Sequence, residues 1–93
     1  MKKFDNVPVE KDTRILFRKV RKLGEYDVLY EIWSWDGINA ESIIFADDDV
    51  TGLEDSEIEE IVKKSKFYKK GSGITLKREK SGYTFVNFNF EVE

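Results

Sequence analysis

The fold is decided by residues 26–46, which read YDVLYEIWSW-DG-INAESIIFA. In residues 26–35, apolar side chains recur at every second position, a period typical of a β-strand. One face carries Tyr26, Val28, Tyr30 and Ile32, and the other carries Asp27, Leu29, Glu31, Trp33 and Trp35. The pair Asp36-Gly37 predicts a tight hairpin, because a type I′ turn needs positive φ at both central residues. We therefore expect two antiparallel strands, over residues 26–35 and 39–46.

The strand over residues 39–46 is apolar on both faces near its end, with Ile43 and Phe45 on one and Ile44 and Ala46 on the other. A strand with two apolar faces is expected at the centre of a sheet.

Residues 13–22 predict a preceding strand, which Leu23-Gly24-Glu25 connects to the hairpin. The alternation of this strand breaks at residues 17–20, which indicates a β-bulge or an exposed second half.

Residues 54–66 predict a helix after Asp47-Asp48-Asp49 ends the sheet. Apolar residues and one serine recur there at helical spacing: Ile58, Ile61, Val62 and Ser65. Two capping boxes compete for its start, one with Glu54 as N-cap and Glu57 at N3, the other pairing Thr51 with Glu54. In the first, Leu53 and Ile58 form a hydrophobic staple.

Two more strands are predicted at Ile74–Lys80 and Tyr83–Val92, joined by a turn at Lys80-Ser81-Gly82. The order β-β-β-α-β-β predicts an α+β fold with an antiparallel sheet of about five strands and one helix packed on one face. Residues 1–93 form a single domain, with residues 1–12 as a flexible arm or a leading edge strand. The predicted core consists of Ile15, Phe17, Val28, Tyr30, Ile32, Ile43, Phe45, Ile58, Ile61, Val62, Ile74, Leu76, Val86 and Phe88.

The composition argues against an enzyme. The chain contains neither cysteine nor histidine, which removes disulfides, thiolate zinc sites and the usual general base. A nucleophilic serine would lack its histidine partner. The segment Gly71-Ser72-Gly73 lacks the Gly-Lys-Ser/Thr ending of a phosphate-binding loop. No apolar run approaches the about 20 residues of a membrane span. We expect a soluble cytoplasmic protein with no catalytic residues and no cofactor.

Charge is distributed unevenly along the chain. Between Lys22 and Lys63 there is no basic residue, and that stretch holds thirteen carboxylates. Each flank, residues 1–22 and 63–93, holds eight Lys or Arg against three acids. The formal net charge of −3 is therefore the sum of +5, −13 and +5. A segregated charge of this kind selects partners by sign.

The acidic segment also contains aromatic residues, a combination that suits a surface engaging a basic protein. We therefore predict a small acidic, non-enzymatic protein-binding module: an inhibitor, immunity or anti-defence protein acting on a basic, nucleic-acid-handling partner. The predicted contact residues are Trp33, Trp35, Asp36, Asp47, Asp48 and Asp49. No metal site is predicted, because consecutive aspartates at a strand end point apart and suit turn and cap chemistry.

Two alternatives stay open at this stage. A nucleic-acid-binding domain would use basic residues of the first and fourth strands, namely Arg14, Arg18, Arg21, Lys77 and Arg78. This requires those strands to lie alongside each other. A structural subunit of a homo-oligomer, a homodimer for example, would instead use an apolar second sheet face that one helix leaves uncovered.

Overall fold

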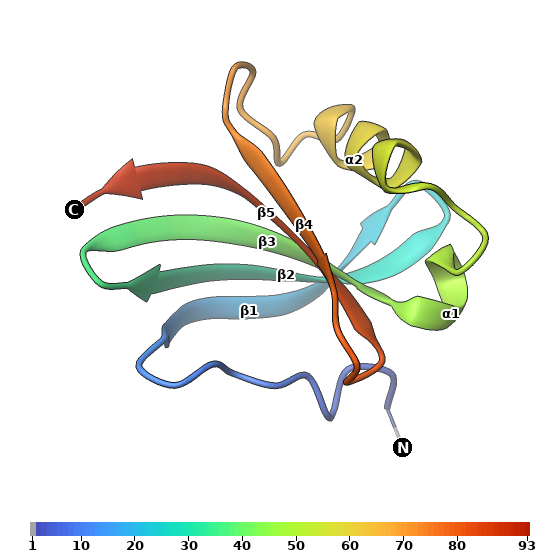
Figure 1. The fold of residues 1–93 in the computed structure, drawn as a ribbon, viewed down its shortest axis with the longest axis horizontal. Helices are drawn as coiled ribbons and strands as arrows, with labels where there is room; N and C mark the ends of the chain where they lie inside the picture. Colours follow the sequence, from blue (N-terminus) through green and yellow to red (C-terminus); the bar gives the residue numbers. More distant parts are fainter. Residues whose placement is uncertain (1) are drawn as a thin grey trace.

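The computed structural model describes residues 2–93, which form a five-stranded antiparallel sheet and two short helices (Figure 1). The elements are β1 (Arg14–Leu23), β2 (Tyr26–Trp35), β3 (Ile38–Ala46), α1 (Asp47–Val50), α2 (Asp55–Lys63), β4 (Ile74–Arg78) and β5 (Tyr83–Val92). The strand order is β1-β2-β3-β5-β4, and every neighbouring pair is antiparallel. The predicted α+β class and five-stranded antiparallel sheet are confirmed.

The β2–β3 hairpin forms as its turn residues predict. Trp35 pairs with Ile38, and the two residues between them have positive φ, 49° at Asp36 and 77° at Gly37. The predicted central position of β3 is confirmed by the strand order and by Ile43, Ile44 and Phe45, whose exposed fractions are 0%.

The prediction of a single helix is wrong, because the three aspartates begin a second one, α1. Asp47 is anchored to the far end of the sheet. Its backbone N–H donates to the Gly82 carbonyl at 2.9 Å, and its Oδ1 accepts from the Thr84 hydroxyl at 2.8 Å. These contacts direct the chain into a helical turn, which the Thr51 hydroxyl closes by donating to the Asp47 carbonyl at 2.6 Å.

The α2 helix begins where the first capping box predicts. Glu54 is the N-cap, and the Glu57 carboxylate accepts from its backbone N–H at 3.0 Å. The competing Thr51 box is therefore wrong. The helix ends at Lys63 and not at residue 66. The Ser65 N–H and hydroxyl both donate to the Val62 carbonyl, at 3.0 and 2.6 Å, and thereby stop the helical pattern.

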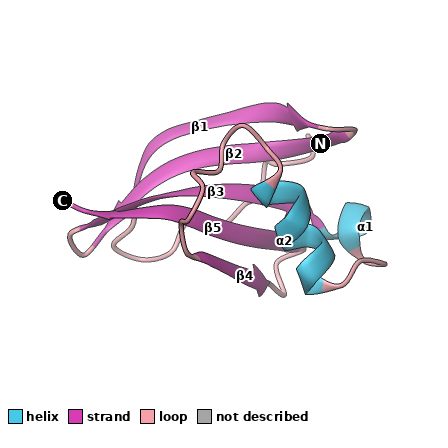
Figure 2. Ribbon diagram, turned by 90° about the horizontal axis from the view of Figure 1, so that it is seen from above, coloured by secondary structure: helices cyan, strands magenta, loops and turns pink. Residues whose placement is uncertain are grey.

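A buried cluster joins α2 to one face of the sheet, which we call the helix-side face. Ile58 and Val62 of α2 are fully buried in a cluster with Leu23, Val28, Ile43, Phe45, Val50, Val86 and Phe88. Figure 2 shows both helices at one end of the sheet. The predicted core positions Tyr30, Ile61, Ile74 and Leu76 are partly buried against this cluster.

Other core predictions fail at the edge of the sheet. Phe17 is 40% exposed, and neither Ile15 nor Ile32 belongs to the helix-side cluster. The cause lies in β1, an edge strand whose register shifts between Ile15 and Phe17, slightly before the predicted bulge. That shift puts Ile15 opposite Trp33, on the other face from Phe17.

The N-terminal arm, residues 2–13, crosses the opposite face of the sheet, which we call the arm-side face (Figure 1). Val7 is 7% exposed in a cluster with Leu29, Ile44 and Tyr83. The arm is also fastened by Lys3, whose carbonyl accepts from the Tyr83 hydroxyl at 2.9 Å and whose ammonium lies 2.6 Å from Asp49. The centre of the second face is thus covered by the chain itself, which removes much of the surface required by the homo-oligomer hypothesis.

A second irregularity, in β5, holds the connection between α2 and β4. Asn89 has φ 55° where the β3–β5 register shifts, and it is 6% exposed. Its side-chain oxygen accepts from the Lys69 N–H at 2.9 Å, and its amide donates to the Phe67 carbonyl and to Glu41, both at 2.8 Å. The Asn89 N–H donates to the Ser72 hydroxyl at 2.7 Å.

Within residues 2–93, neither helix has the length or the apolar character that crossing a membrane requires.

Candidate functional site

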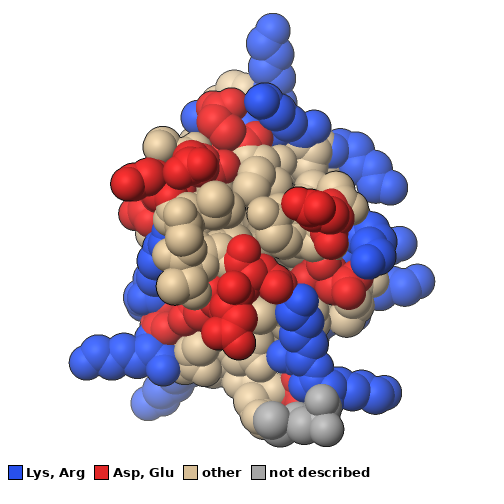
Figure 3. Space-filling model, turned by 90° about the vertical axis from the view of Figure 1, so that its right-hand side faces the viewer, with Lys and Arg blue, Asp and Glu red and all other residues tan. Residues whose placement is uncertain are grey.

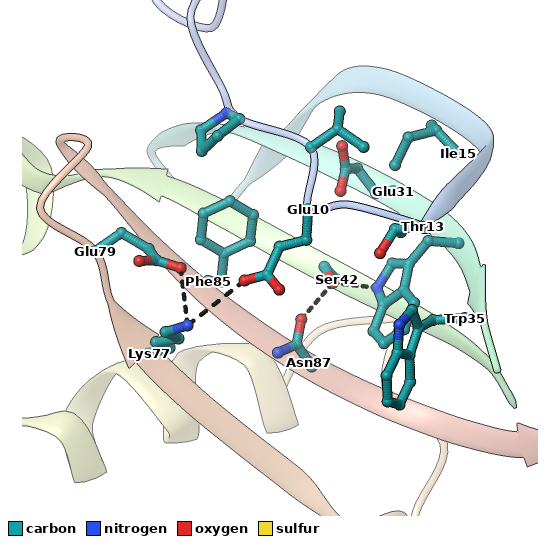
Figure 4. Close-up of a pocket in the computed structure, with 13 residues that line it drawn as sticks. Glu10, Thr13, Ile15, Glu31, Trp35, Ser42, Lys77, Glu79, Phe85 and Asn87 are labelled. Atoms are coloured by element: carbon teal, nitrogen blue, oxygen red, sulfur yellow. Dashed lines mark hydrogen bonds and ion pairs between the residues drawn. The ribbon is translucent and has the colours of Figure 1, made fainter.

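A groove of about 470 Å³ lies between the N-terminal arm and the arm-side face (Figure 4). The arm supplies one wall, and the five strands together with the connection between β4 and β5 supply the rest. Its lining residues are Pro8, Val9, Glu10, Thr13, Ile15, Glu31, Trp33, Trp35, Ser42, Lys77, Glu79, Phe85 and Asn87. Its volume falls in the range of about 300–1,000 Å³ that ligand sites occupy.

Both tryptophans of the chain line this groove. Trp33 and Trp35 lie two residues apart on β2, so the strand pleat turns them to the same face. Trp35 is 47% exposed, which leaves much of its ring accessible. Phe85 of β5 and Ile15 of β1 extend the apolar lining on either side.

A chain of hydrogen bonds orients Trp33 across the sheet. Its indole Nε1 donates to the Ser42 hydroxyl at 2.7 Å, and that hydroxyl donates to the Asn87 side-chain oxygen at 2.5 Å. The Asn87 amide in turn donates to the Thr75 hydroxyl at 3.2 Å. Because Ser42 is 1% exposed, this network forms a fixed floor beneath the aromatic wall.

The charged lining consists of three glutamates and one lysine. At the rim, the Lys77 ammonium lies 3.3 Å from Glu79 and 3.5 Å from Glu10 (Figure 4). The hydrogen bond to Glu79 and the nearby carboxylates raise the pKa of Lys77, so it stays a cation at neutral pH. With all four groups ionised, the lining carries a net charge of −2, which falls to −1 when the Arg18 guanidinium that pairs with Glu31 is included.

Glu31 is the buried acid of the groove, with an exposed fraction of 3%. It forms an ion pair with Arg18, the residue opposite it on β1. Burial raises the pKa of the Glu31 carboxyl, although the Arg18 guanidinium acts in the other direction. A carboxylate with this environment favours a nearby positive charge.

The six predicted contact residues do not form one surface. Trp33 and Trp35 line the groove, and Asp36 lies in the exposed turn at the same end of β3. Residues 47–49 lie at the other end of that strand, about 27 Å away at 3.4 Å per residue. Asp47 accepts a hydrogen bond from the Thr84 hydroxyl, and Asp49 forms an ion pair with Lys3. Two of these three aspartates therefore have structural partners.

Figure 3 shows the end of the molecule that carries α1. Its acidic side chains fall into several separate groups, with Lys and Arg around their margins. The charge segregation of the sequence is therefore only partly retained on this surface. Among residues 2–93, no three acidic side chains come together as ligands for a metal ion.

The basic residues of the nucleic-acid alternative are also separated. The arrangement that this alternative requires, with the first and fourth strands alongside each other, does not occur, because β1 and β4 are opposite edges of the sheet. Four strand spacings, about 19 Å, separate them. Lys77 forms an ion pair with Glu79, and Arg18 forms one with Glu31. Arg78 binds Asp55 at 2.9 Å and donates to the Leu53 carbonyl at 2.5 Å. Of the five residues, Arg14 and Arg21, both on β1, are the two that form no ion pair within residues 2–93.

Several groove residues carry no signal in the sequence. Pro8, Val9 and Glu10 reach the groove only because the arm docks through Val7, a contact between distant parts of the chain. Phe85 and Asn87 alternate on β5, but the alternation alone does not say which face holds a groove.

The chain matches no protein-family model, and comparison with curated proteins and with solved structures finds no match either.

Proposed function

We propose that this protein is a non-enzymatic binding module whose groove takes a basic segment of a partner protein. One observation supports this most: two tryptophans, one of them 47% exposed, lie in an open groove whose charged lining is three glutamates and one lysine. The groove therefore combines aromatic faces with a negative field, the two properties that attract Arg and Lys side chains.

Recognition would begin at Trp35. A guanidinium or ammonium group stacked over its indole gains about 0.5–2 kcal/mol, with the larger values where water is excluded. The aliphatic stem of the same ligand side chain packs on Ile15, as Arg and Lys stems commonly do on apolar surfaces. Phe85 lies about 20 Å further along, at 3.4 Å per residue of β3, and can contact a different side chain of the segment. Trp33 keeps its orientation through Ser42, so its ring needs little rearrangement on binding.

The rim carboxylates would hold a second positive charge of the segment, because Lys77 is paired with Phe85, at the far end of the groove from Trp35. Glu10 and Glu79 now share Lys77, whose ammonium lies 3.5 and 3.3 Å from them. An incoming cation can take the place of Lys77 between the two glutamates, so affinity should fall as salt rises. A basic, nucleic-acid-handling protein remains the proposed partner class, and the inhibitor, immunity or anti-defence role stays part of the proposal.

The test uses the protein's own fluorescence, since both tryptophans line the groove. Two short peptides are titrated, one alternating arginine with leucine and one alternating glutamate with leucine. We expect the arginine peptide to change the emission and the glutamate peptide to leave it unaltered. Trp35→Ala should weaken arginine-peptide binding about tenfold, with Trp33 still reporting.

Phe90→Ala is the matched control, because Phe90 is an aromatic residue with a similar exposed fraction, 41%, outside the groove. It should bind like the unaltered protein. Equal response to both peptides, or equal affinity in Trp35→Ala and Phe90→Ala, would rule out the groove as a site for basic segments.

A further inference from the structure

The β1 strand is an open sheet edge. In the part of the chain that the structure describes, it pairs with β2 alone, and it is ten residues long. The opposite edge, β4, has only five residues. A short edge strand is a common protection against unwanted pairing, and β1 lacks that protection.

The side chains of β1 add apolar surface to this edge. Leu16, Phe17 and Val20 are 47%, 40% and 51% exposed. Of the seven large apolar side chains that are exposed in residues 2–93, three are on this one strand. From Phe17 to Leu23 the register with β2 is continuous, which makes a regular platform of seven residues after the bulge.

The charge of β1 indicates which partner fits. The strand holds five basic residues and no acid, namely Arg14, Arg18, Lys19, Arg21 and Lys22. Arg18 and Lys22 are paired with Glu31 and Asp27 of β2. Within residues 2–93, no ion pair involves the other three, so the edge keeps an unbalanced charge of +3.

We propose that β1 accepts an acidic, extended segment of a partner protein as a sixth strand. An added strand satisfies the open backbone groups of the edge, and its alternate apolar side chains cover Val20, which lies on the other face from Lys19 and Arg21. Acidic side chains opposite Lys19 and Arg21 give the favourable cross-strand charge pairs. A second copy of β1 is disfavoured, because basic residues would then face basic residues.

Basic side chains on an edge also act as protection against self-pairing. That protection works only against basic or neutral strands, and it does not explain three exposed apolar side chains. The edge site is distinct from the groove, because none of residues 17–23 lines the groove and β1 carries excess positive charge, whereas the groove lining is negative. One molecule can therefore hold a basic and an acidic segment at the same time.

The experiment uses a short peptide that alternates glutamate with valine, and one that alternates lysine with valine as the charge control. Binding is followed by the amide NMR signals of the isotope-labelled protein. We expect the glutamate peptide to shift the signals of Phe17–Leu23 and to slow their exchange with water. The lysine peptide should leave these signals in place.

The decisive variant is Lys19→Glu/Arg21→Glu, which should weaken glutamate-peptide binding about tenfold or more. Lys63→Glu/Lys70→Glu is the matched control, with the same change of charge away from β1, and should bind as before. Circular dichroism verifies that each variant is folded. The separate Val20→Thr change keeps a β-branched residue and should weaken binding by about threefold through lost apolar contact.

Four results would overturn the proposal. One is equal affinity in the two charge-reversed variants, and another is signal change confined to the groove tryptophans. The third is a concentration-dependent dimer in sedimentation that Lys19→Glu/Arg21→Glu abolishes, since a second copy would then occupy the edge. The fourth is a short oligonucleotide that shifts the β1 signals when the glutamate peptide does not. None of these results depends on the fluorescence response of the groove.

Discussion

Glu31 shows how a single buried acid links the sheet to the groove. It is almost fully buried, it pairs with Arg18, and its carboxyl has a raised pKa because burial disfavours the charged form. A carboxyl with a raised pKa binds its proton more tightly in the folded protein than in the unfolded chain. Protonation of Glu31 therefore favours folding, and the preference is lost as the pH rises through the folded pKa.

This gives a pH-dependent prediction for Glu31→Gln, which removes the titrating group. The difference in unfolding free energy, unaltered protein minus variant, should decrease as the pH rises from below the ordinary Glu value of 4.5 to neutrality. Urea denaturation at several pH values measures it. The Arg18 ion pair exists only when Glu31 is ionised, so its effect is already contained in the pKa of Glu31 and in the measured slope.

A second variant tests the cause. Arg18 lowers the pKa of Glu31, so Arg18→Gln leaves burial unopposed and should make the stability of the protein fall further, over a pH range that extends to higher pH. A flat difference between the unaltered protein and Glu31→Gln would show that Glu31 keeps an ordinary pKa in the folded state.

The start of α2 depends on one carboxylate. Glu57 accepts the N-cap amide of Glu54 at 3.0 Å, and this also places a negative charge in the first turn of the helix. We predict that Glu57→Ala lowers the unfolding free energy by about 0.5–1.5 kcal/mol, measured by urea denaturation. Glu60→Ala, an exposed site on the same helix, should change it by less than about 0.5 kcal/mol. Equal losses would mean that the capping bond contributes nothing.

Elements with a strong period could be predicted from the sequence. The bounds of β2 match the prediction, and those of β3 differ by one residue, because alternation and the Asp36-Gly37 turn are local signals. By contrast, α1 exists through contacts of Asp47 with Gly82 and Thr84, residues distant in the chain. A local pattern cannot encode such contacts.

The strand order and the position of the arm also depend on contacts between distant residues, so local sequence patterns do not predict them. Nothing in the sequence states that β5 lies between β3 and β4, so the local patterns also allow the two basic strands to be neighbours. Trp33 and Trp35 could be singled out by their alternation, whereas the opposite groove wall depends on where Val7 docks. The predicted end of β4 is also two residues late, because the Glu79 N–H donates to the Tyr83 carbonyl and closes the turn early.

Taken together, the sheet has apolar clusters on both faces, one closed by α2 and one by the N-terminal arm. The arm is part of the folded unit because Val7 is buried between Leu29, Ile44 and Tyr83. Its position also shapes the groove, so the stability of the arm and binding in the groove should change together.

We predict that Val7→Asp lowers the unfolding free energy by about 2–3 kcal/mol, because a carboxylate cannot remain in this cluster. The exposed arm-side face should then bind a hydrophobic dye such as ANS. Val9→Asp, two residues along and 49% exposed, is the matched control and should be within about 0.5 kcal/mol of the unaltered protein. Similar behaviour of both variants would show that the arm adds no stability.

The bulge at Asn89 restricts the length of the connection between α2 and β4. Connections between secondary-structure elements usually tolerate insertions and deletions. Here the Phe67 carbonyl, the Lys69 amide and the Ser72 hydroxyl all meet residue 89 from the far side of the connection. An added or removed residue between 67 and 72 would break at least one of these bonds, so the length of this segment should evolve, or be redesigned, only jointly with residue 89.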